Sequence, residues 1–396
     1  MSALTEFLAE HHYALQTSEG TLTGSGAEFL AREGRSARFF LLGEDHGIGS
    51  NLQFATALFN LLQPSGYNAY VTEIGPVSAQ HMSTLLEQPD SLAALSEFFT
   101  QYPFSIPFSW YEEEVRLLQA LQRSPAKAEP AIIGVDQEFI LSPQFHLETL
   151  QAICTDPAFK TKITEWLHAE KAAIRDMYAG KPIDQLSLFM NLALPAEWSS
   201  LRNHFEVQHD PAALHIMEAL AASHEIYMYY KTEAYYLNNH VRSLLMKKYF
   251  YQAYQQQQAA QPETKYLIKL GANHIERGHS AMGIQDVGNF ISELAVMENS
   301  QSFHLFVLPV SGKQNAWLPF LPEAFKAMPI EANTQPELRP ILENVQEKSG
   351  WHLYDLRPLR LRQNYWADGN ADFKKFFRGY DAIMLMHAVD PATLIS

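Results

Sequence analysis

The stretch Phe39-Phe40-Leu41-Leu42-Gly43-Glu44-Asp45-His46-Gly47 decides which fold we expect of this chain. Its first four residues form an apolar run of strand length, and a glycine-rich break and an amphipathic segment beginning near Asn51 follow it. This order is typical of the first strand, loop and helix of an α/β sheet. Open α/β sheets bind ligands in a crevice outside the carboxyl ends of their strands, where Glu44, Asp45 and His46 would lie. The alternative is a surface turn followed by a helix cap.

Further apolar runs of strand length recur along the chain, with helical segments between them. The helix expected from about Asn51 to Gln63 has apolar residues three and four positions apart, as a core-facing stripe requires. Strands separated by helices predict an α/β fold with a largely parallel central sheet and helices on both faces. The predicted strands are Arg38 to Leu42, Tyr67 to Thr72, Ala131 to Val135, Lys265 to Leu270, Phe303 to Pro309, Trp351 to Leu356 and Tyr380 to Met386.

Two segments and one large block carry no strand signal. Residues 1–36 are expected to form a short helix, Leu4 to Tyr13, and a Gly/Ser-rich connection, and residues 312–349 a loop over the sheet edge. Residues 143–260 are expected to be a helical cap insertion, which would lie over the crevice because it follows the carboxyl end of a strand. The α/β core domain would then consist of residues 1–142 and 261–396.

Composition and charge exclude several classes of protein. The chain has 396 residues, of which 47% are hydrophobic, so it can bury a sizeable core. Its 44 acidic and 29 Lys and Arg residues give a net charge of −15, which argues against nucleic acid and membranes as partners and favours a small-molecule or peptide substrate. Cys154 is the single cysteine, which excludes an intramolecular disulfide and a thiolate zinc site. Residues 1–20 lack the features of a signal peptide, so we expect a cytoplasmic protein, whose oligomeric state the composition does not indicate.

Polar side chains follow four of the predicted strands. The carboxyl ends of parallel strands meet at one edge of a sheet, so we expect these side chains to share one cleft. A single His at a strand end is more often bound to a backbone partner than catalytic, and the prediction therefore depends on the convergence. The side chains are Glu44, Asp45 and His46; Glu73; Asp136 and Glu138; and Asn273 and His274.

Two of these strand ends share the pattern Gly-x-x-His, at Gly43 to His46 and at Gly271 to His274. Glycine permits a tight exit from a strand, which would direct the following residues inward. Two imidazoles with carboxylates between them suit general base catalysis, in which a neutral His takes a proton from water. They also suit a divalent metal held by His46, Glu73 and His274, with water in an open position. The pattern predicts no other cofactor.

Other enzyme classes find no support in the sequence. It has no Gly-x-Ser-x-Gly elbow and no phosphate-binding loop with Gly-Lys-Ser/Thr. The pair Gly47-x-Gly49 lacks the third glycine of a dinucleotide-binding fingerprint.

The motifs resemble the superfamily that joins erythromycin esterases, ChaN-like proteins and the TIKI and TraB families. The resemblance spans roughly residues 38–390 and is nearest to the erythromycin esterase branch. Its motifs are Leu42-Gly43-Glu44-Asp45-His46-Gly47, Thr72-Glu73-Ile74-Gly75, Asn239-x-x-Arg242-x-x-x-Met246, Gly271-Ala272-Asn273-His274 and Gly379-Tyr380-Asp381-Ala382-Ile383.

This resemblance implies a hydrolase that cleaves an ester or lactone by His-activated water, without a covalent serine. It implies that His46 is the general base, that Glu44 and Glu73 orient the water or the ring, and that His274 and Arg242 bind the substrate or stabilise an oxyanion. The short Gly-x-x-His spacing is nearer to the ChaN and TIKI branches, so a metal-dependent hydrolase or peptidase and a haem-binding protein remain alternatives. The expected substrate-binding residues are Asp45, Asp136, Arg242, Asn273 and Arg277.

Overall fold

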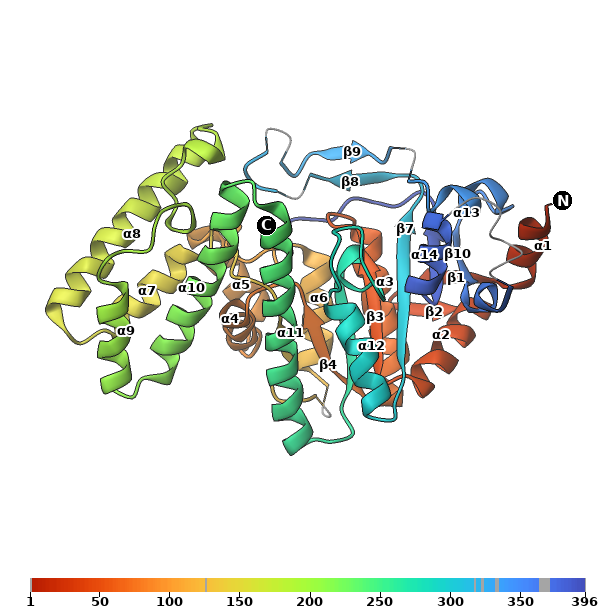
Figure 1. Cartoon of the computed structure of the whole chain (residues 1–396), viewed down its shortest axis with the longest axis horizontal. Helices are drawn as coiled ribbons and strands as arrows, with labels where there is room; N and C mark the ends of the chain where they lie inside the picture. Colours follow the sequence, from red (N-terminus) through yellow and green to blue (C-terminus); the bar gives the residue numbers. More distant parts are fainter. Residues whose placement is uncertain are drawn as a thin grey trace.

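The computed structural model describes residues 2–124, 127–316, 318–321, 324–331, 335–362 and 371–395. Its core is built on one large sheet (Figure 1). Within the described residues, the strands of this sheet lie in the order β2 (Thr21–Thr23), β1 (His12–Ser18), β10 (Trp351–Asp355), β11 (Ala382–Met386), β7 (Ser302–Pro309), β3 (Phe39–Glu44), β6 (Lys265–Gly271), β4 (Tyr67–Thr72) and β5 (Ile132–Gly134).

The strands from β11 to β5 are parallel, and β10, β1 and β2 extend one edge in antiparallel pairs. The predicted largely parallel sheet is therefore confirmed. In the register of the central strands, Phe39 lies opposite Tyr266 and Glu44 opposite Gly271. This register brings the polar ends of β3 and β6 to the same edge.

Helices cover both faces of the sheet, because successive side chains of a strand point to opposite sides. Phe40 and Leu42 pack into one apolar cluster, and Phe39 and Leu41 pack into another. The first cluster includes residues of α2 (Ser25–Ser36), α3 (Gly49–Leu62), α4 (Pro76–Leu86), α5 (Ser91–Gln101) and α6 (Glu112–Gln122). The second includes residues of α1 (Ala3–Glu10), α11 (Tyr235–Ala260), α12 (Val287–Met297), α13 (Arg339–Asn344) and α14 (Ala371–Gly379).

Residues 143–260 form helices and no strand, and most of them lie to one side of the sheet (Figure 1). Helices α7 (Pro143–Ile153), α8 (Pro157–Tyr178), α9 (Trp198–Val207) and α10 (Pro211–Lys231) share a third apolar cluster. Helix α11 continues from them into the layer on the sheet, where Phe250 and Tyr254 pack against Phe39 and Tyr266. The last helix of the expected cap thus also covers the core.

Two parts of the chain differ from the expectation. The first helix ends at Glu10, and residues that were expected to continue it or to form a connection make β1 and β2. Only Leu15 of β1 is buried, and β1 pairs with β10, more than 300 positions along the chain, so local sequence carries little signal for it. In the segment expected to be a loop, β8 (Lys313–Asn315) and β9 (Ala327–Pro329) form a small antiparallel ribbon above the central sheet (Figure 1).

No helix in the part of the chain that the structure describes is long and apolar enough to cross a membrane.

Candidate active site

A cleft of about 1460 Å³ lies at the carboxyl ends of the central strands, between them and the helices of residues 143–260. Eight of the ten residues that the sequence places in the cleft or assigns to the site line this cleft. They are Glu44, Asp45, His46, Glu73, Asp136, Arg242, Asn273 and His274. Asp45 and Asn273 are exposed on its wall, and the others are largely buried.

The glycines of the two Gly-x-x-His motifs allow the strand ends to approach each other. A Cβ atom at Gly43 would lie 2.8 Å from the Ile275 side chain and 2.9 Å from the Ala272 backbone. A Cβ atom at Gly271 would lie 3.2 Å from both Glu73 Oε2 and His46 Nε2. The absence of side chains at these two positions therefore leaves room for the catalytic candidates.

His46 lies between two carboxylates. Its Nδ1 is 3.6 Å from Glu44 Oε1, and its Nε2 is 3.7 Å from Glu73 Oε2. The ring of Phe108 stacks on the imidazole, with centroids 4.1 Å apart and planes at 21°. The His46 side chain is 14% exposed, so it reaches the cleft while most of its surface is covered.

Glu73 is ionised and held by several donors. Arg242 Nη2 donates to Glu73 Oε1 at 2.9 Å, and the Gly271 amide donates to Glu73 Oε2 at 2.6 Å. Arg242 also binds Asp136 with two hydrogen bonds of 2.8 and 2.6 Å, which fix the guanidinium plane. Burial raises the pKa of Glu73, but His274, His46 and Arg242 outweigh it and hold this pKa well below its ordinary value.

His274 is a cation at neutral pH. Its Nδ1 lies 2.7 Å from Asp286 Oδ2, and its Nε2 lies 3.4 Å from Glu73 Oε1. Burial lowers the pKa of His274, but Glu73 and Asp286 outweigh it and raise this pKa to about 10. An imidazolium donates hydrogen bonds and cannot accept a proton, so His274 suits charge stabilisation better than base catalysis.

Two residues beside the site were not predicted from the sequence, Asp286 and the buried Lys269. Asp286 is the N-cap of α12, where its side chain accepts a hydrogen bond from the Val287 amide. An Asp before an amphipathic helix signals a cap, but it does not identify a partner such as His274, 12 positions earlier. Lys269 Nζ lies 2.7 Å from Glu44 Oε1. A charged residue inside the apolar strand of residues 265–270 was a signal that its side chain has a buried partner.

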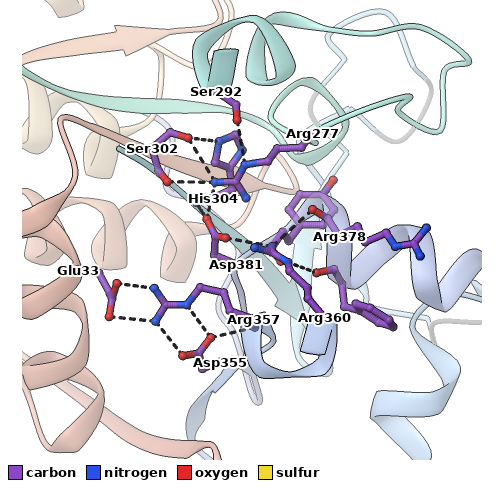
Figure 2. A network of polar contacts seen from close by, with 12 residues as sticks. Glu33, Arg277, Ser292, Ser302, His304, Asp355, Arg357, Arg360, Arg378 and Asp381 are labelled. Carbon is purple, nitrogen blue, oxygen red and sulfur yellow. Dashed lines mark hydrogen bonds and ion pairs between the residues drawn. The ribbon is translucent and has the colours of Figure 1, made fainter. Parts of the chain in front are cut away.

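Arg277 does not lie in the cleft, which corrects its expected role in substrate binding. Its guanidinium donates to Asp381 Oδ2 at 2.7 Å, to Ser292 Oγ at 3.1 Å and to the Ser302 carbonyl at 3.0 Å (Figure 2). Ser302 begins β7 and Asp381 directly precedes β11, so this network lies at the amino ends of these strands. The neighbouring residue Glu276 still lines the cleft, so the chain stays beside it and only the Arg277 side chain is directed into this other network.

Glu138 also has a structural role and does not line the cleft. Its Oε1 accepts from the amides of Val77 and Ser78 at the start of α4, at 2.9 and 3.3 Å, and its Oε2 lies 2.9 Å from His146 Nε2. A Cβ atom at Gly75 would lie 2.2 Å from this carboxyl group. The carboxylate thus caps the amino end of α4, where it also complements the helix dipole.

His46, Glu73 and His274 do not fit the divalent metal considered from the sequence. Both Glu73 oxygens already accept hydrogen bonds, one of them from the Arg242 cation, and His274 is itself protonated. A metal ion bound to Glu73 would therefore lie beside a guanidinium and an imidazolium, which repel it. No group of three or more His, Cys, Asp or Glu side chains within the described ranges could hold a metal ion.

Comparisons with known proteins find similarity in structure. No family model matches the chain, and no curated protein matches it in sequence. An erythromycin esterase mutant in its open conformation superposes with a TM-score of 0.61 at 17% identity, covering 93% of this chain and 95% of that one. A succinoglycan biosynthesis protein gives a TM-score of 0.61 at 12% identity, and a Bacillus cereus protein 0.59 at 13% identity; each match covers 99% of this chain and 98% of the other. The chain therefore has the fold expected from the erythromycin esterase resemblance.

Proposed function

We propose that this protein is a hydrolase that cleaves an ester or lactone with a water molecule activated by His46. The observation that carries this proposal is the position of the His46 ring, which lies between the carboxylates of Glu44 and Glu73 in the cleft. The shared fold with an erythromycin esterase supports it at the level of architecture.

In the proposed first step, neutral His46 takes a proton from water while the water oxygen attacks the ester carbonyl carbon. The carbonyl π electrons move to the carbonyl oxygen, and the imidazolium that forms is stabilised by the anions Glu44 and Glu73. The His–carboxylate distances of 3.6 and 3.7 Å exceed those of direct hydrogen bonds, as is common in enzymes without substrate, where such contacts tighten on binding.

The negative charge on the tetrahedral intermediate requires a donor, and cationic His274 is the proposed one. Asp286 holds its Nδ1, so the Nε2 proton is directed to the side of the cleft where Glu73 lies. When the intermediate collapses, the C–O bond to the leaving group breaks and His46 returns its proton to the departing alkoxide. No side chain becomes covalently bound in either step.

The charge of the cleft favours neutral or cationic esters over anionic ones. Nine Asp and Glu side chains among the described residues line it, against three cationic Lys and Arg side chains, Lys231, Arg242 and Lys375. An anionic substrate would be repelled by this excess. The volume of about 1460 Å³ is larger than the usual range of roughly 300–1000 Å³ for small-molecule pockets, which favours a bulky substrate.

The test is hydrolysis of a panel of bulky esters and lactones by the purified protein. The panel includes pairs that differ only in a quaternary ammonium or a carboxylate group. We expect turnover of a neutral or cationic member, and no acyl adduct in the intact mass of protein quenched during turnover. Absence of hydrolysis across the panel, or a covalent acyl adduct, would contradict the proposal.

A further inference from the structure

The carboxylate of Glu44 forms an ion pair with a buried lysine. Lys269 is on β6, is 2% exposed, and its Nζ lies 2.7 Å from Glu44 Oε1. The same oxygen faces His46 Nδ1 at 3.6 Å. The other oxygen, Glu44 Oε2, is buried and accepts no hydrogen bond from the part of the chain that the structure describes. The contact with Lys269 is thus well placed to set the orientation of this carboxylate.

A second buried acid shares the lysine. Glu114 Oε2 lies 3.3 Å from Lys269 Nζ, and Tyr70 donates to Glu114 Oε1 at 2.8 Å. Burial raises the pKa of Glu114, whereas Lys269 and His46 outweigh burial and hold the pKa of Glu44 below its ordinary value. The ammonium is closer to Glu44, so the negative charge of the pair is concentrated on the carboxylate beside His46.

We propose that Lys269 is a positioning residue, whose ammonium holds the Glu44 carboxylate with Oε1 toward His46. This inference rests on the proposed role of His46 as the base. An imidazolium formed during the reaction needs an anion in a fixed place, and a carboxylate held by a buried ammonium need not reorganise when the imidazolium forms. The titratable groups around Glu44 are Lys269 on β6, Glu114 on α6, Tyr70 on β4, Tyr111 before α6, and Asp45 and His46 in the following turn.

The decisive variant is Lys269→Met, which keeps the length of the side chain and removes its charge. We expect kcat to fall roughly tenfold to 100-fold, less than on loss of a general base, with little change in KM. Without the ammonium, protonated Glu44 is favoured, so the acid limb of the kcat profile moves to higher pH. Lys269→Arg retains the charge, so its acid limb should lie close to that of the wild type.

A matched control is Lys265→Met, on the same strand. Lys265 Nζ binds the Gly34 and Arg35 carbonyls at the opposite end of the sheet. This variant removes a lysine of β6 that lies away from the cleft, so its kcat and pH profile should equal those of the wild type.

A measurement that needs no substrate separates this inference from the proposed function. In protein labelled with ¹³C at the glutamate carboxyl carbons, with the Glu44 signal assigned from Glu44→Gln, Lys269→Met should raise the pKa of Glu44. This outcome supports the ion-pair role even if no ester is hydrolysed. If Lys269→Met does not fold, the same measurements are made on the double variant Lys269→Met/Glu114→Gln. This variant buries one acid fewer without a cation. A folded variant with an unchanged Glu44 titration and an unchanged kcat would overturn the inference.

Discussion

The imidazole of His46 stacks on the ring of Phe108 at a centroid distance of 4.1 Å, and the Phe108 backbone has a φ of 64°. A non-glycine residue in this left-handed region carries a conformational cost of roughly 1–2 kcal/mol. The strained backbone therefore places an aromatic ring on the proposed base, which limits the rotation of the imidazole.

Two substitutions distinguish the effect of the Phe108 ring on catalysis from the effect of its backbone conformation on stability. Phe108→Ala and Phe108→Gly both remove the stacked ring, so both should lower kcat to a similar degree. Glycine adopts a positive φ without strain. The free energy of unfolding of Phe108→Gly should therefore be roughly 1 kcal/mol higher than that of Phe108→Ala. Urea unfolding of both variants checks this order, and an Ala variant as stable as the Gly variant would argue against backbone strain.

The contacts of His274 with Glu73 and Asp286 predict a loss of stability at alkaline pH. The pKa of His274 is raised to about 10 in the fold, above the ordinary value of 6.5, so its contribution is fully present below about pH 6.5 and is lost as the pH rises toward 10. The free energy of unfolding should therefore fall between pH 7 and 10 more steeply in the wild type than in His274→Gln. Parallel curves for the two proteins would contradict the assigned charge of His274.

Arg277 should matter for stability and not for catalysis, because its network lies at the opposite ends of the strands (Figure 2). Arg277→Gln leaves the largely buried Asp381 with one cation fewer, and we expect the protein to lose roughly 1–3 kcal/mol of stability. At a temperature where the variant is fully folded, its kcat should equal that of the wild type. A large decrease in kcat without a decrease in melting temperature would restore Arg277 to the site.

Chelation should leave the proposed reaction unchanged. Both oxygens of Glu73 already accept hydrogen bonds from Arg242 and Gly271, and His274 is protonated, so this group does not favour a divalent cation. Turnover measured after dialysis against a strong chelator should equal turnover before it. Loss of activity that zinc or manganese restores would instead support the metal-dependent alternative.

The sequence indicated the centre of the fold better than its edges. The apolar runs before Gly43 and Gly271 are buried on both sides, and they identified β3 and β6 and the cleft at their ends. Strand β1 was not predicted, because Leu15 is its single buried residue and its partner β10 is distant in the sequence. Edge strands owe their formation to such distant pairing, which local periodicity does not record.

Some of the site residues were predictable from the sequence and others were not. Residues at strand ends, such as Glu44 and Glu73, were predictable because parallel strands align their carboxyl ends. Arg277 was misplaced because proximity to His274 in the sequence does not show which way a side chain points, and its partner Asp381 is 104 positions away. Lys269 and Asp286 were missed because their roles depend on partners more than ten positions away, which only the folded structure identifies.

The most direct test of the proposed function is the turnover of His46→Ala on an ester that the wild type hydrolyses, measured together with its melting curve. Loss of a positioned general base should lower kcat by roughly 10²–10⁴-fold, and the fold should persist because His46 lies at the cleft and not in an apolar cluster. A folded His46→Ala protein with the kcat of the wild type would contradict the assignment of His46 as the base.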